Sequence, residues 1–81
     1  MFLGHYIKEV RVIHEDSQET LAYKLGVKRQ AISRWERDES LPSLHHIVQL
    51  VELYQLDLHD IMRHVKCSLK RKETNYGRNF R

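Results

Sequence analysis

Apolar residues recur three and four positions apart along most of this chain, which is the spacing of helices that each bury one face. Near the start, Leu3, Ile7 and Val10 predict the inner face of a helix over residues 3–14. No run alternates apolar and polar residues over the length that a strand needs. The pattern therefore predicts an all-α fold.

Two short helices follow, over residues 18–25 and 29–37, and a tight turn joins them. Ser17 precedes the first, where a side-chain oxygen can cap a free amide of the first turn. Gly26 follows it, where a chain that leaves a helix commonly needs a left-handed residue. Both ends of this helix are therefore marked in the sequence.

The second of these helices has a small apolar side, Ile32 and Trp35, and is otherwise polar. Five polar residues lie on it or just before it: Lys28, Arg29, Gln30, Ser33 and Arg34. Arginine pairs bidentately with guanine and glutamine with adenine in the major groove. Two helices at this spacing, the second with such a face, are typical of a helix-turn-helix.

A fourth helix is predicted over residues 44–54, capped by Ser43, and a fifth from Leu58, capped by Asp57. The residues predicted to point inward from the fourth helix are Leu44, Ile47, Val48, Val51 and Tyr54. The pattern weakens after Val65 and sets no end to the fifth helix. We expect one small domain over residues 1–68 and a basic, solvated tail over residues 69–81.

Four segments of the chain, including the two short helices described above, align with one protein family. They read IKEVR over residues 7–11, SQETLAYKLGVKRQAISRWE over 17–36, LPSL over 41–44 and LDLHDI over 56–61. In this order the chain resembles the Xre-type, lambda-repressor-like helix-turn-helix family over about residues 3–63. The resemblance implies a five-helix domain that binds double-stranded DNA sequence-specifically and regulates transcription, as a repressor of bacterial or phage genes.

The resemblance also implies roles for individual residues. It assigns base reading to Arg29, Gln30 and Arg34, and phosphate binding to Gln18, which would also brace Gln30 or Arg29. The weaker phosphate candidates are Ser33, Lys24 and Tyr23, and for Tyr23 surface packing is an equal alternative. Lys28 stands where the family has a capping serine or threonine. It cannot cap, and it either reaches a phosphate or a base edge or is a plain surface lysine.

Two other positions carry structural expectations from the family. Arg11 is expected to pair with Glu36 and so to set the angle between the first and third helices. Glu15 and Gln55 stand where the family prefers residues suited to helix ends, glycine above all, so Glu15 is expected in a less comfortable conformation.

The net charge of +3 is unevenly distributed. Residues 24–37 carry five basic side chains against one acid, residues 38–60 carry five acids and no Lys or Arg, and residues 63–81 carry seven bases against one acid. Such an arrangement orients a domain on a polyanion. The modest total argues against a purely electrostatic, non-specific nucleoid protein.

Other classes of function find little support. Cys67 is the only cysteine, which excludes an intramolecular disulfide and fits a reducing cytoplasm. His64 and Cys67 are too few ligands for zinc, so no metal and no cofactor is expected. The chain has no catalytic motif and no apolar run near the roughly 20 residues of a membrane span.

Two partner hypotheses remain. A single domain of this kind covers few base pairs, so we expect a homodimer on an inverted repeat. Its surface is expected on the fifth helix, from Leu58, Ile61, Met62 and Val65. Alternatively, the same fold is an antitoxin-type or other protein-interaction module, whose basic tail folds on a partner.

Overall fold

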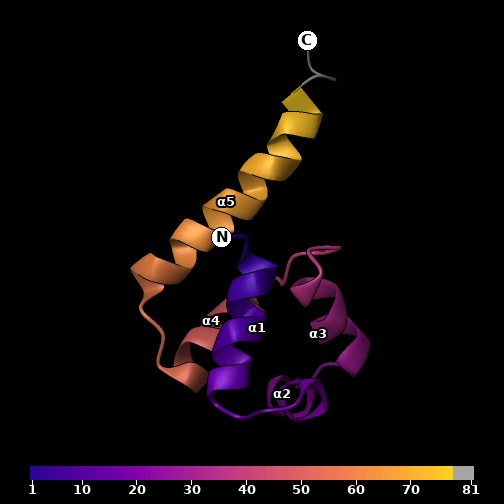
Figure 1. Ribbon diagram of the computed structural model, residues 1–81, viewed down its shortest axis with the longest axis vertical. Helices are drawn as coiled ribbons and strands as arrows, with labels where there is room; N and C mark the ends of the chain where they lie inside the picture. Colours follow the sequence, from indigo (N-terminus) through magenta and orange to yellow (C-terminus); the bar gives the residue numbers. More distant parts are fainter. Residues whose placement is uncertain (78–81) are drawn as a thin grey trace.

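The computed structural model describes the backbone of residues 1–77 and the side chains of residues 1–70. It contains five helices and, over the described backbone, no strand, so the all-α prediction is confirmed (Figure 1). The helices are α1 (Leu3–Ile13), α2 (Gln18–Leu25), α3 (Arg29–Glu36), α4 (Leu44–Tyr54) and α5 (Leu58–Gly77). α2 and α4 have the predicted bounds, whereas α1 and α3 each end one residue earlier than predicted.

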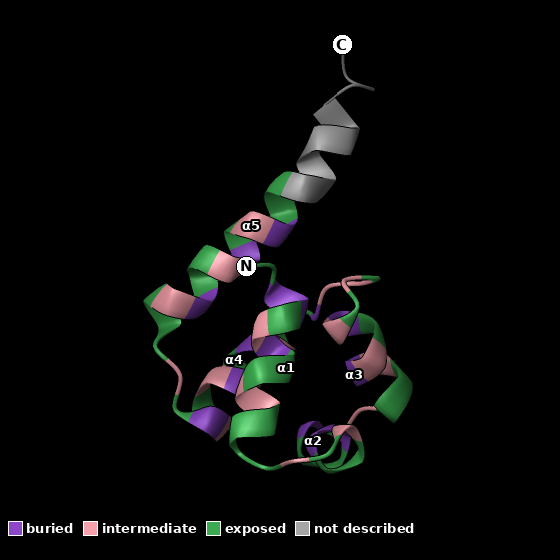
Figure 2. Ribbon diagram, in the orientation of Figure 1, coloured by how far each residue is buried: buried purple, intermediate pink, exposed green. Residues whose placement is uncertain are grey.

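The first four helices and the first part of α5 surround one apolar core, and the rest of α5 projects beyond it (Figures 1 and 2). α3 packs on both α1 and α2, and α5 packs on α1. The six largest fully buried side chains are Leu3, Ile7, Leu21, Ile32, Leu50 and Ile61. They come from all five helices, so each helix contributes to the same core.

The predicted helix caps are present. The side chain of Ser17 accepts a hydrogen bond from the Thr20 amide, and that of Ser43 accepts one from the His46 amide. Asp57 accepts from the His59 amide at 2.8 Å. Gly26 ends α2 in the left-handed conformation, with φ of 71°. These local bonds explain why the sequence marked these helix ends correctly.

The predicted inner face of α4 is partly wrong. Leu44 and Val48 are 72% and 45% exposed, whereas Leu50 is only 1% exposed. Together with Ile47 and Tyr54, Leu50 forms the stripe that faces the core. Because α4 is apolar around most of its circumference, helical spacing alone could not decide which stripe is buried.

Two of the four residues that we expected to form the dimer surface on α5 belong to the core instead. Ile61 and Val65 are buried in the core, whereas Leu58 and Met62 remain exposed. α5 also continues as helix through Gly77, into the segment that we assigned to a tail. Residues 78–81 of that segment lie outside the described part of the chain. None of the described helices is long and apolar enough to cross a membrane.

Among the described residues other than glycine, three have left-handed backbone conformations: Glu15, Asp38 and Gln55, with φ of 58°, 56° and 54°. The strained conformation expected of Glu15 is confirmed, and Gln55 replaces glycine at the end of α4 at the same kind of position. Asp38, directly after α3, was not anticipated. Each side chain costs roughly 1 kcal/mol in this region relative to glycine.

We expect Gln55→Gly to stabilise the domain by about 0.5–1 kcal/mol, because glycine removes the left-handed strain and offsets its own higher unfolded-state entropy. The free energy of unfolding, measured by chemical denaturation, checks this. Glu52→Gly, one turn earlier on the exposed side of α4, is the matched control and should destabilise by about 1 kcal/mol. Equal destabilisation by both substitutions would contradict the role assigned to Gln55.

Candidate nucleic-acid interface

α3 has a buried side and an exposed polar side. Ile32 and Trp35 anchor it in the core. Of the predicted site residues, Lys28, Arg29, Gln30 and Arg34 are exposed, Ser33 is half-buried, and all five belong to α3 or its first flanking position. The structure therefore brings these residues together on one solvent-facing surface around α3.

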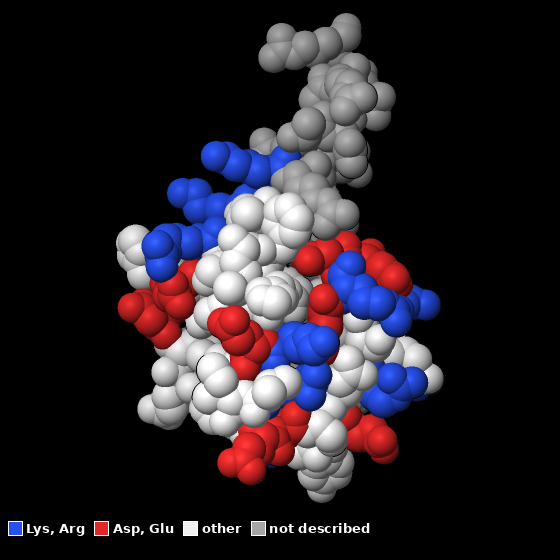
Figure 3. Space-filling view, in the orientation of Figure 1, with Lys and Arg blue, Asp and Glu red and all other residues white. Residues whose placement is uncertain are grey.

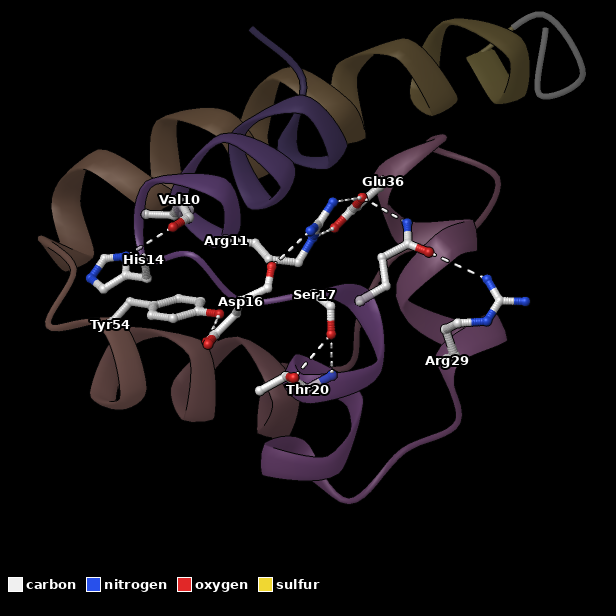
Figure 4. Close-up of polar contacts among 10 residues, drawn as sticks. Val10, Arg11, His14, Asp16, Ser17, Thr20, Arg29, Glu36 and Tyr54 are labelled. Carbon is white, nitrogen blue, oxygen red and sulfur yellow. Dashed lines mark hydrogen bonds and ion pairs between the residues drawn. The ribbon is translucent and has the colours of Figure 1, made fainter.

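The carboxylate of Glu36, at the end of α3, is almost completely buried. Its side chain is 4% exposed, and it pairs with Arg11 of α1, which is 11% exposed. Arg11 donates from Nε to Oε2 at 2.6 Å and from Nη2 to Oε1 at 3.1 Å (Figure 4). The expected ion pair between the first and third helices is confirmed. The bond to Glu36 is also the main reason that the pKa of Arg11 is raised.

Arg11 also joins α1 to the turn before α2. Its Nη1 donates to the backbone carbonyl of Asp16 at 2.9 Å. A guanidinium presents its donors in a fixed plane, so these bonds together set the orientation of the side chain. Arg11 thus fixes α3 and the start of α2 relative to α1.

Gln18, the first residue of α2, extends this network to the start of α3. Its Nε2 donates to Glu36 Oε1 at 2.9 Å, and its Oε1 accepts from Arg29 Nη1 at 3.3 Å. Because an ionised carboxylate only accepts hydrogen bonds, the amide nitrogen of Gln18 must face Glu36 and its oxygen must face Arg29. The sequence left open whether Gln18 braces Gln30 or Arg29, and in the structure its partner is Arg29.

These contacts form a continuous chain, which we call the polar brace: Arg11, Glu36, Gln18 and Arg29. Arg29 uses one N–H of its guanidinium in the brace, and Gln18 uses one of its two N–H groups. Arg29 is exposed, so its remaining donors lie at the open end of the brace, and Gln18 keeps a second amide N–H. Arg29 is thereby held in place before any ligand arrives, which lowers the entropic cost of a contact.

The beginning of α3 has no side-chain cap, as the lysine at position 28 predicted. Its first amides therefore leave the positive end of the helix open to solvent or to an anion. Lys28 is exposed and adds a full positive charge at the same place. The combination favours a negatively charged ligand at this end of α3.

An acidic residue near this surface is neutralised by its neighbours. Asp16 pairs with Lys24 at 3.0 Å and accepts a hydrogen bond from the Tyr54 hydroxyl at 2.8 Å. The Lys24 ammonium and then the Tyr54 hydroxyl lower the pKa of Asp16. Lys24 is consequently engaged within the protein, which reduces its value as a phosphate contact.

The histidines and the cysteine do not gather into a metal site. Within the described residues, no group of three or more His, Cys, Asp or Glu side chains is arranged to hold an ion. His64 instead stacks on Tyr6, with ring centroids 4.2 Å apart.

Comparisons with known proteins agree with this geometry. A family model described as Helix-turn-helix matches residues 7–61. Among solved structures, the chain is similar to the P22 c2 repressor protein in complex with synthetic operator 9T in the presence of Tl+. The two share 26% sequence identity with a TM-score of 0.72, over 79% of this chain and 97% of that chain. No curated protein matches the chain significantly.

We expect Glu36→Gln to destabilise the domain by about 2 kcal/mol, since it leaves Arg11 without a countercharge in a largely buried place. Glu39→Gln is the matched control, because the ion pair of Glu39 with Arg37 is more than half exposed. That change should cost less than about 0.5 kcal/mol. Chemical denaturation measures both, and similar losses in the two variants would show that the Glu36 carboxylate has no special role.

Proposed function

We propose that this chain, which belongs to the helix-turn-helix family, binds double-stranded DNA sequence-specifically as a repressor of transcription. The observation that carries the proposal is the exposed Arg and Gln face of α3, mounted on a buried apolar side and fixed by the polar brace. The similarity to a repressor bound to its operator supports it. A regulator of this kind acts in the cytoplasm, and we propose no catalytic activity for it.

In this proposal α3 enters the major groove and is the recognition helix. Arg29, Gln30 and Arg34 contact base edges, where arginine reads guanine and glutamine reads adenine. Each good bidentate pair discriminates against a wrong base by about 1–3 kcal/mol. The brace helps because Arg29 reaches the groove already oriented.

Phosphate contacts then set the register of α3 in the groove. Gln18 retains one amide N–H for a phosphate, Lys28 supplies a charge, and Ser33 supplies a hydroxyl. These contacts carry no sequence information by themselves, but they make the affinity depend on salt. Gln18 would join the two kinds of contact, since it holds Arg29 with one atom and a phosphate with another.

Selection of binding sites from a random duplex pool tests the proposal. We expect a recurring motif with wild-type protein, and relaxed preference at one position per half-site with Arg34→Ala, because one base-edge contact is lost. Arg37→Ala is the matched control. This arginine directly follows the same helix but pairs with Glu39, so its loss should leave the motif unchanged. Absence of any motif, or an unchanged motif with Arg34→Ala, would contradict base reading by α3.

We further propose that the chain binds an inverted repeat as a homodimer through α5. The apolar side chains that α5 leaves exposed near its start are Leu58 and Met62, since Ile61 and Val65 belong to the core. Two side chains make a small apolar contact, so this dimer is expected to form weakly alone and more readily on DNA, where two half-sites raise the effective concentration.

Sedimentation of the protein at high micromolar concentration, with and without the selected DNA, checks the dimer. We expect Met62→Glu to weaken dimer formation, because it places a charge in the apolar contact. Val12→Glu, at an exposed valine of α1, should leave it unchanged. A wild-type protein that stays monomeric both alone and on an inverted repeat would overturn the dimer.

One observation favours a second candidate function. A shallow hollow on α5 is lined by the apolar Leu58 and Met62, by His59 and by the basic Arg63 and Lys66. A row of basic side chains continues along this side of the helix (Figure 3). Such a face suits an acidic amphipathic helix of another protein, and a selection that returns no DNA motif would favour this module.

A further inference from the structure

α1 begins without a cap of its own. Phe2 occupies the N-cap position and makes no side-chain hydrogen bond there. The first two amides of the helix are satisfied by residues from distant parts of the chain instead. Leu3 donates to Ser68 Oγ at 2.9 Å, and Gly4 donates to Asp38 Oδ1 at 3.2 Å. Two different elements, α5 and the turn after α3, thus share the capping of α1.

Asp38 closes the end of α3. It takes the left-handed conformation with φ of 56°, and its amide donates to the Trp35 carbonyl at 3.1 Å. The next amide, of Glu39, donates to the Arg34 carbonyl at 2.9 Å. This is how a helix is terminated by a left-handed residue. The side chain of Asp38 is therefore fixed to the last turn of the recognition helix.

The start of α1 lies directly on this last turn. A Cβ added to Gly4 would be 2.9 Å from the Glu36 carbonyl oxygen and 2.9 Å from Asp38 Oδ2, closer than real Cβ contacts allow. The positive end of α1 thus faces the carbonyls at the negative end of α3, which is a favourable arrangement of helix dipoles. The contact is close enough that a shift of either helix must move the other.

Ser68 connects α5 to this junction. It is a buried polar residue of the second half of α5, only 3% exposed. Its hydroxyl accepts from Leu3 and donates to Asp38 Oδ1 at 3.5 Å. One side chain therefore bridges α5, the first amide of α1 and the residue that ends α3. Leu3, Gly4 and Ser68 all lie outside residues 7–61, the part that the family model matches.

We infer that Ser68, through Asp38 and the first turn of α1, is a positioning residue for the recognition helix. The polar brace ties the side chains of Arg29, at the start of α3, and Glu36, at its end, to α1 and α2. The junction adds a second hold on the end of α3, through Asp38, so that the angle of α3 in the groove also depends on α5. The inference rests on the proposed function of α3. It extends the DNA-binding unit beyond the matched residues into the second half of α5.

The test compares Ser68→Ala with Leu69→Ala, a matched control at the next residue of α5, whose side chain is exposed. The first readout is amide hydrogen exchange by NMR on the full chain without DNA. In Ser68→Ala we expect the amides of Asp38 and Glu39 to exchange about tenfold faster than in the control, because the end of α3 is less firmly held. Leu69→Ala should leave both amides as in wild type.

The second readout is DNA affinity, measured well below the unfolding temperature of each variant. Ser68→Ala should weaken binding to the selected duplex about five- to tenfold, and binding to a random duplex less than about twofold. Misplaced base contacts lower specific affinity, whereas phosphate attraction remains. A change with a structural role alone would lower the melting temperature and leave the ratio of the two affinities unchanged.

Two variants of Asp38 keep the inference falsifiable. Asp38→Asn retains an oxygen acceptor and tolerates the left-handed conformation, so it should keep the specificity ratio of wild type. Asp38→Ala retains neither advantage and should behave like Ser68→Ala.

The outcomes separate cleanly. If Ser68→Ala leaves both the exchange of α3 and the specificity ratio as in Leu69→Ala, the inference is overturned. If the random pool yields no motif but the exchange at Asp38 and Glu39 responds as expected, the proposed DNA function fails while the positioning of α3 by Ser68 stands. If a motif emerges and Ser68→Ala changes only the melting temperature, the proposed DNA function stands and the positioning of α3 by Ser68 fails.

Discussion

The buried carboxylate of Glu36 is the constraint on which the rest of the site depends. A charge in so poorly solvated a place requires partners, and Arg11 and Gln18 supply them from two other helices. Because Glu36 holds the amide nitrogen of Gln18, the amide oxygen points the other way and accepts a hydrogen bond from Arg29. One desolvated group thus determines the relative placement of three helices and the orientation of a side chain on the candidate DNA surface. Its main effect is on geometry, because a buried ion pair adds little net stability.

Most of the fold could be predicted because the helix ends are set by residues close to them in the sequence. Ser17, Ser43 and Asp57 cap helices through amides two or three residues away, so the sequence next to each helix end was sufficient. The α4 core stripe could not be predicted in the same way. Leu44 and Leu50 are both leucines on one apolar helix, and only the packing of the other helices decides which of them is buried. For the same reason Ile61 was assigned to a surface although it is a core residue.

Part of the candidate site could likewise be predicted from the sequence, and part of it required the structure. The polar face of α3 was expected from the residues of the helix themselves, and the pair of Arg11 with Glu36 from a resemblance; both are present in the structure. The choice between Arg29 and Gln30 as the partner of Gln18 required coordinates, since both residues belong to the first turn of α3. The junction of Leu3, Asp38 and Ser68 left only one local signal, an aspartate after a helix, where left-handed residues occur. Its other members are up to 65 residues apart, and no spacing rule relates them.

A structure of the full chain bound to its selected duplex tests most directly whether the brace presents α3 to the major groove in a preformed orientation. We expect α3 to lie in the groove with Arg34 and Gln30 on base edges. We also expect the hydrogen bonds that Arg11 and Gln18 donate to Glu36, and the one that Arg29 donates to Gln18, to be the same as in the free protein. A complex in which α3 faces away from the bases, or in which Gln18 has released both Glu36 and Arg29, would contradict this expectation.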